Sequence, residues 1–249
     1  MGILKSDYDV GLYSVSVKIY NILKNIISSV IVVSIPRLCA YEGQGEREKF
    51  ISTAHDVFQT IITATLPALT GICLYSKEIV QIVGGVEYAD AYSSLSLLAV
   101  ALLFCMFSYF WWQCVLVPLH KEKMSLVSAV VSALLNLSLN FILIPLYSHN
   151  AAAFTTILAE GVAMLIAVIY SRRFIKLPSV NKVLLKTVAG CLLIILIALI
   201  TRYLIQNSFI RLVAGASISI VIYFAVELLL KNESVTFIVR RFKRKGRSQ

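Results

Sequence analysis

Seven long apolar stretches alternate with short polar segments along this chain. Each stretch is close to the ~20 mostly apolar residues that an α-helix needs to cross the roughly 30 Å hydrocarbon core of a bilayer. The pattern therefore predicts seven membrane-spanning segments. They cover residues 11–36, 52–75, 93–117, 125–147, 151–170, 187–205 and 209–230.

The segments are predicted to be helices rather than strands. A transmembrane strand alternates apolar and polar residues and needs only about 10 of them, whereas these stretches are longer and lack the alternation. Composition agrees with a membrane protein, because 59% of the residues are hydrophobic, 14% are charged and the mean hydropathy is +0.84. We therefore expect an all-α, polytopic membrane protein with about seven transmembrane helices.

The basic residues predict the orientation of the chain, because Lys and Arg near span ends are retained on the cytoplasmic side. With the amino end outside, seventeen of the 23 Lys and Arg residues fall in inside segments and four fall in outside ones. The inside set includes the tail sequence RRFKRKGR, which we expect to meet anionic lipid headgroups rather than nucleic acid. The net charge of +10 is thus mainly a topology signal.

The amino end indicates that this chain belongs to a longer protein. Seven spans with the carboxyl end inside place the amino end outside, yet the first residues lack the features of a signal peptide. Residues 1–7 instead look like the end of an earlier helix that runs into an external turn. We expect a carboxyl-terminal portion; the alternative is that Met1 is genuine and the chain inserts alone.

Polar residues line one side of the first span. We predict that this stripe faces a polar cavity, because a Lys at mid-bilayer costs at least ~2.5 kcal/mol. The alternative is that the lysines reach the two interfaces and that the Asn and Ser residues hold helices together. At 100° per residue, a stripe about 120° wide holds Ser14, Lys18, Asn21, Lys24, Asn25 and Ser28.

The second span carries a similar stripe, which predicts a wet cavity between the two helices. Gln59 joins Lys18, Asn21, Lys24 and Asn25 as a candidate for binding substrate in that cavity. Asp56 is a candidate for coupling transport to an ion, with an interfacial carboxylate as the alternative. The stripe consists of Asp56, Gln59, Thr60, Thr63 and Thr70.

Later spans add a few polar residues. Asn136 and Asn140 lie on one face of the fourth span, and Glu160 lies near the middle of the fifth. A carboxylate at that depth must be protonated, paired or hydrated. Glu160 is therefore a second coupling candidate, and the alternative is a structural partner for a polar residue on a neighbouring helix.

No enzyme chemistry is predicted. The five cysteines are scattered, with no CxxC pair, and the three histidines lie near different span ends, so neither a metal site nor a cofactor is expected. The sequence also lacks a nucleophile elbow and a phosphate-binding loop. Its loops are short, which favours a transporter over an enzyme.

The order of these features resembles a known family. The pieces VGLYSVSVKIYNILKNIISSVIVVSIPRL, EGQGEREK, SKEIVQIVGGVEYADAYSSLSLLAV and LVPLHKEKMSLVSAVVSALLNLSLNFILIPLYSHNAAAFTTILAEGV follow one another as in the carboxyl half of Wzx-type polysaccharide (O-antigen) flippases. This family belongs to the superfamily of the MATE exporters and the lipid II flippase. The similarity covers residues 8–175, and 176–249 only as two extra helices; Asn150-Ala151-Ala152 replaces the Gly-Ala pair usual at the start of the fifth span.

The resemblance implies a division of the chain. Residues 1–175 would form five spans of the second lobe of a MATE-like transporter, 176–230 two additional helices, and 231–249 a basic cytoplasmic tail.

The resemblance also implies a function. The family moves undecaprenyl-pyrophosphate-linked oligosaccharides across the bacterial cytoplasmic (inner) membrane, and a pyrophosphate would suit Lys18 and Lys24. Expected partners are this lipid-linked substrate, membrane lipids and the polysaccharide polymerase machinery. The alternatives are a MATE-like small-molecule antiporter and an inactive truncated fragment.

The predicted topology is testable with reporter fusions at loop positions. Fusions after Lys49, Lys123, Arg173 and Gln249 should report a cytoplasmic location. Fusions near Asp9, Glu87, His149 and Asn207 should report an external one. An external location of residues 121–123 would overturn the predicted number of spans.

Overall fold

The computed structural model describes residues 5–232, which are helical apart from short connections. In chain order the elements are α1 (Asp7–Gly43), α2 (Arg47–Gly84), the 3₁₀-helix η1 (Val86–Ala91), α3 (Tyr92–Phe110), the π-helix η2 (Trp111–Leu116), α4 (Lys123–Ser171), α5 (Asn181–Leu204) and α6 (Ser208–Leu229). Six helices of the described residues are long and apolar enough to cross a membrane, with η1, α3 and η2 forming one of them. The predicted all-α, multi-pass fold class is confirmed.

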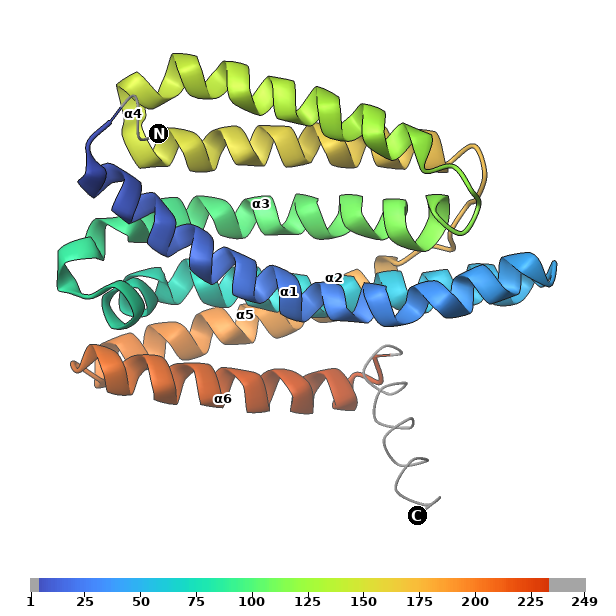
Figure 1. Ribbon diagram of the computed structural model, residues 1–249. Helices are drawn as coiled ribbons and strands as arrows, with labels where there is room; N and C mark the ends of the chain where they lie inside the picture. The colour runs from blue at the N-terminus through green and yellow to red at the C-terminus, as the bar shows by residue number, and fades with distance from the viewer. Residues whose placement is uncertain (1–4, 233–249) are drawn as a thin grey trace.

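The fourth and fifth predicted spans are the two arms of α4. This helix has 49 residues, which at 1.5 Å per residue would give a straight rod more than twice as long as a bilayer core is thick. Ser148 breaks it with non-helical angles of φ 51° and ψ −133°. Figure 1 shows α4 turning back there into two antiparallel stretches, so the six helices supply seven membrane-length segments.

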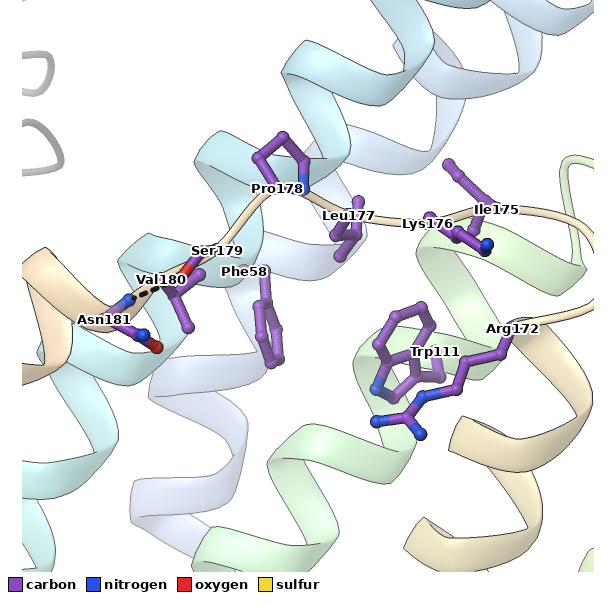
Figure 2. A pocket seen from close by; sticks show the side chains of 10 residues that line it. All are labelled: Phe58, Trp111, Arg172, Ile175, Lys176, Leu177, Pro178, Ser179, Val180 and Asn181. Atoms are coloured by element: carbon purple, nitrogen blue, oxygen red, sulfur yellow. Dashed lines mark hydrogen bonds between the residues drawn. The ribbon is translucent and has the colours of Figure 1, made fainter.

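The connections between helices gather at the two ends of the bundle (Figure 1). The α1–α2 turn, the loop before α4 and the connector before α5, all predicted to be cytoplasmic, lie at one end. The Ser148 turn and the α5–α6 turn, predicted to be external, lie at the other. Figure 2 shows the connector, residues 172–180, crossing the first of these ends.

Local sequence signals set the helix ends. The side chain of Ser6 caps α1 by accepting a hydrogen bond from the backbone N–H of Asp9 at 3.3 Å. Asp7 and Asp9 place negative charge in the first turn, where the helix dipole favours it. Asn207 caps α6 through its side-chain oxygen, which accepts from two backbone N–H groups at 3.0 and 3.1 Å. Gly45 takes the left-handed angle of φ 71° that turns the chain between α1 and α2.

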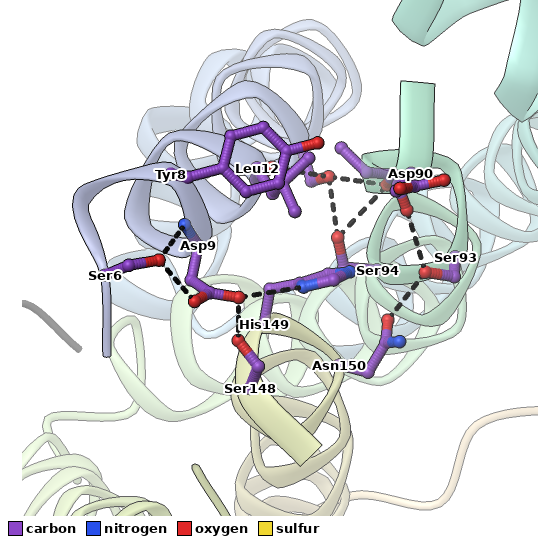
Figure 3. A network of polar contacts seen from close by, with 12 residues as sticks. Ser6, Tyr8, Asp9, Leu12, Asp90, Ser93, Ser94, Ser148, His149 and Asn150 are labelled. Atoms are coloured by element: carbon purple, nitrogen blue, oxygen red, sulfur yellow. Dashed lines mark hydrogen bonds and ion pairs between the residues drawn. The ribbon is translucent and has the colours of Figure 1, made fainter. Parts of the chain in front are cut away.

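A polar network fastens the Ser148 turn to α1 and α3 (Figure 3). Asp9 accepts a hydrogen bond from Ser148 Oγ, and its Oδ1 lies 4.0 Å from Nδ1 of His149. Asn150 Oδ1 accepts from Ser93 Oγ at 2.8 Å. Asn150 belongs to the Asn-Ala-Ala sequence that replaces the usual Gly-Ala pair. Its hydrogen bond connects the start of the second arm of α4 to α3.

The buried core lies among α1, α2, α3 and the second arm of α4. Ile31, Phe50 and Leu102 are each 0% exposed. Small polar groups join α1 to α3, because Ser16 Oγ donates to the carbonyl oxygen of Ala91 and lies 2.9 Å from the hydroxyl of Ser94. Such hydrogen bonds between helices are typical of membrane proteins.

α5 and α6 dock on α2 through tyrosines that lie against glycines. A Cβ atom at Gly215 would lie 2.2 Å from the hydroxyl oxygen of Tyr75, and one at Gly190 would lie 2.7 Å from the ring of Tyr223. A larger residue at either position would force the tyrosine side chain or the helices to shift. Tyr223 Oη also donates to the carbonyl oxygen of Thr63 at 2.7 Å.

An ion pair strengthens this docking. Arg211 of α6 binds Glu78 of α2 at 3.1 Å, and the Glu78 carboxylate is buried. The division at residue 175 into a five-span lobe and two additional helices stays a prediction. The predicted basic tail, 231–249, lies outside the described residues from 233 onward.

Candidate functional site

The polar stripe of the first span lies on the exposed face of α1. Lys18, Asn21 and Asn25 are all exposed, and so is Ser14. The opposite face of α1 is packed into the bundle through Leu12, Ile19, Tyr20, Ile27 and Ile31. No other described part of the chain therefore covers these four residues of the stripe.

The polar residues of α2 lie in a different environment. Gln59 is 3% exposed, and its Nε2 lies 3.3 Å from Nε2 of His55 on the same helix. The described residues therefore do not show the predicted wet cavity between the polar stripes of α1 and α2. Gln59 is inside the bundle, whereas Lys18, Asn21 and Asn25 are outside it.

The α2 stripe needs no water because its hydroxyl groups are bonded within the helix. Thr60, Thr63 and Thr70 each donate to the carbonyl oxygen four residues earlier, at 2.8 to 2.9 Å. Serine and threonine commonly satisfy themselves in this way within helices. Asp56 is half-buried near the start of α2, and its carbonyl oxygen is one of these acceptors.

Lys24 differs from Lys18 in that it is half-buried and turned toward other residues of the bundle. Its Nζ lies 5.8 Å from the centre of the Tyr20 ring, a cation–π arrangement. It also interacts electrostatically with Glu160 on the second arm of α4. The structure thus brings together two predicted site residues from helices far apart in sequence.

Cys105 of α3 completes this cluster. It is 4% exposed, and its thiol lies near the Glu160 carboxylate. Tyr20, 8% exposed, adjoins the same thiol. The sequence indicated only an apolar packing role for Cys105 and no role for Tyr20. Helices α1, α3 and α4 therefore meet at one ionisable cluster.

Asn136 and Asn140 hold the two arms of α4 together. Asn140 Nδ2 donates to Asn136 Oδ1 at 2.8 Å, and Thr155 Oγ1 on the opposite arm donates to Asn140 Oδ1 at 2.7 Å. Thr155 also accepts from Asn136 Nδ2 at 3.4 Å. This closed set of contacts fixes the register of the antiparallel arms.

Comparisons with known proteins agree with the arrangement of helices. The fold is similar to that of "Lipid II flippase MurJ, inward closed conformation", with a TM-score of 0.73 over 93% of this chain at 17% sequence identity. This chain covers 48% of the length of that structure. Residues 1–93 match the model of a family described as "Polysaccharide biosynthesis protein". A search of curated protein sequences gave no match.

These comparisons define a class of protein. At this identity the structural match establishes the fold alone, a multi-pass fold shared with half of a lipid II flippase. The family match adds similarity to proteins described by polysaccharide biosynthesis, over the first part of the chain. Together they support the polysaccharide flippase type that the sequence resembles.

The charge pair of the cluster is testable by a double-mutant cycle. Lys24→Met should destabilise the chain, because Glu160 would lose its opposite charge in a half-buried setting. When Glu160→Gln is added, the loss should be smaller than the sum of the two single losses. We expect a coupling energy of about 1 kcal/mol, as is typical of polar contacts between membrane helices. Unfolding of the purified chain in mixed micelles by increasing sodium dodecyl sulfate measures it.

Lys18→Met is the matched control for this cycle. Lys18 lies on the same helix but on its exposed face. Its effect should therefore add to that of Glu160→Gln without coupling. Strict additivity of Lys24→Met and Glu160→Gln would contradict the pair.

Proposed function

We propose that this chain is part of a flippase that moves undecaprenyl-pyrophosphate-linked oligosaccharide repeat units, such as O-antigen units, across the cytoplasmic membrane. The activity serves surface polysaccharide biosynthesis and is transport rather than catalysis. The family match over residues 1–93 and the fold shared with a lipid II flippase support a lipid-linked cargo.

One observation carries the proposal, the exposed polar stripe of α1. Lys18, Asn21 and Asn25 face away from every other described helix, on a segment apolar enough to span a bilayer. Contact with lipid tails would cost several kcal/mol for the charge alone on the stricter scales. The stripe therefore faces either a water-filled space or another protein surface.

The cargo and the stripe have complementary chemistry. A pyrophosphate is strongly anionic and is attracted by a fixed cation such as Lys18, particularly where the surroundings exclude bulk water. The side-chain amides of Asn21 and Asn25 both donate and accept hydrogen bonds, as sugar hydroxyls require. In the longer protein, a first lobe would face this stripe, and cargo would move through the space between the lobes.

Lys24 and Glu160 provide a means of coupling. While Glu160 is ionised, its negative charge attracts Lys24 and would weaken the attraction of Lys24 for an anionic cargo. A proton taken up by Glu160 removes that negative charge and frees the positive charge of Lys24. Proton binding and pyrophosphate binding would then favour each other, as energetic linkage requires. Asp56 remains a second coupling candidate. Gln59 remains a candidate for binding substrate, although it is buried inside the bundle.

Substitution of Lys24 tests the cargo. In a complete protein that contains this segment, Lys24→Ala should lower the rate of flipping of a polyisoprenyl-pyrophosphate oligosaccharide in reconstituted vesicles by at least about tenfold, the value of one charge-assisted contact. Lys24→Arg should stay within about threefold of the parent. Lys182→Ala, which removes an exposed basic residue on α5, is the control and should leave the rate unchanged. Equal rates for Lys24→Ala and Lys24→Arg would remove the cargo role.

Substitution of Glu160 tests the coupling. Glu160→Gln keeps the shape and the hydrogen-bonding capacity of the side chain but cannot take up the proton. Flipping by this variant should lose its dependence on an imposed pH gradient, whereas the parent should retain it. If Glu160→Gln responds to the gradient as the parent does, and only Glu160→Leu fails to fold, Glu160 is a structural hydrogen-bonding residue.

A further inference from the structure

A second polar feature lies at the end of the bundle that is predicted to be cytoplasmic. A cavity of about 540 Å³ opens beneath the connector between α4 and α5 (Figure 2). Its volume is within the ~300–1,000 Å³ range of ligand pockets and is far larger than one ion needs. The lining comes from α2, η2 and residues 172–181, with no residue of α1. The cavity is therefore separate from the polar stripe.

One side of this cavity is a packed aromatic wall. Phe58 of α2 and Trp111 of η2 line it, with ring centres 5.9 Å apart. Phe58 also packs against Phe107 at 5.4 Å and Phe110 at 4.8 Å. Trp111 is only 7% exposed. Packed rings at this depth offer an apolar surface where Trp is favoured, at the boundary between headgroups and hydrocarbon.

The other side of the cavity is positively charged. Arg172 and Lys176 line it together with the polar side chains of Ser179 and Asn181, and no lining residue is acidic. Both basic residues are exposed. Neither takes part in any ion pair found among residues 5–232. The cavity thus presents two cations that the described part of the chain does not neutralise.

The backbone of the connector that carries the charged residues is held in position. The Arg47 side chain of α2 donates a hydrogen bond to the carbonyl oxygen of Phe174, and the Lys121 Nζ lies 5.7 Å from the centre of the Phe174 ring. Ile175 is 3% exposed and anchors the middle of the connector in the core. A preformed site of this kind loses little conformational entropy when a ligand binds.

We infer that this cavity is a binding site for the headgroup of an anionic phospholipid, with the phosphate between Arg172 and Lys176 and the upper acyl chains against Phe58 and Trp111. The positive charge and the apolar surface lie side by side at one end of the bundle, as the headgroup and acyl chains of a lipid require. The planar guanidinium of Arg172 also suits the oxygen atoms of a phosphate. The inference is independent of the proposed transport function, because the cavity lies away from the α1 stripe.

Trp111 makes the site measurable by fluorescence. The chain has two tryptophans, so Trp112→Phe leaves Trp111 as the only one. This variant is reconstituted in phosphatidylcholine bilayers that contain increasing fractions of phosphatidylglycerol with a nitroxide at carbon 5 of the acyl chain, and equally labelled phosphatidylcholine is the comparison. Quenching of Trp111 should occur at several-fold lower mole fractions of the anionic lipid. Circular dichroism and the unquenched emission maximum verify the fold.

Three substitutions in this background locate the charge. Arg172→Gln and Lys176→Gln should each reduce the preference for phosphatidylglycerol by about fivefold, the contribution expected of one basic residue at a membrane surface. Arg173→Gln is the matched control, because it removes the same charge one residue away and does not line the cavity. Arg173→Gln should change the preference for phosphatidylglycerol by less than about twofold.

Each remaining outcome overturns the inference. Equal quenching by the two labelled lipids would show that the cavity has no preference for anionic lipid. An equal loss in Arg173→Gln and Arg172→Gln would show diffuse surface attraction instead of a site. Relief of quenching by polyisoprenyl pyrophosphate, at fractions where unlabelled phosphatidylglycerol gives none, would assign the cavity to the transported class of lipid. Relief by inorganic phosphate at millimolar concentration would assign it to a soluble anion.

Discussion

The structure depends on the requirement that polar groups inside a bilayer find their partners within the protein. Each backbone N–H and C=O in the hydrocarbon region must be bonded, so the chain crosses as helices and makes its turns at the two ends of the bundle. The side chains follow the same rule. The threonines of α2 bond to their own helix, Asn136 and Asn140 bond to the opposite arm of α4, and Lys24 is close to Glu160. Lys18, Asn21 and Asn25 have no such side-chain partner among the described residues, and this contrast is why we propose them as part of a functional surface.

Much of the fold could be predicted because membrane thickness fixes the length of each apolar segment. The turn within α4 was predictable from the short polar interruption around Ser148, although the backbone stays helical up to that residue. The π-helix at Trp111–Leu116 was not, because it gives no periodic signal that differs from an ordinary helix. The docking of α5 and α6 was also hidden, since Gly190 and Gly215 indicate close contact only once their tyrosine neighbours are known.

The site was predictable in part for a similar reason. Helical periodicity places residues on a face, and it correctly grouped Lys18, Asn21 and Asn25. It does not reveal what each face meets. Lys24 lies at the edge of the stripe and is close to Glu160, while the threonines of the similar stripe on α2 bond to carbonyl oxygens of their own helix. Periodicity therefore predicts which residues share a polar face. It predicts the hydrogen-bonding partner of a polar residue only when the two residues lie on the same helix.

The tyrosine and glycine contacts have a mechanical consequence. The ring of Tyr75 lies against Gly215, and the ring of Tyr223 lies against Gly190. If one helix slid along its neighbour by the rise of one residue, about 1.5 Å, each ring would collide with backbone or side-chain atoms. The Arg211–Glu78 pair opposes the same displacement about one helical turn from the Tyr75–Gly215 contact. Helices α2, α5 and α6 are thus interlocked by these contacts. A movement of α2 would have to carry α5 and α6 with it or break the contacts.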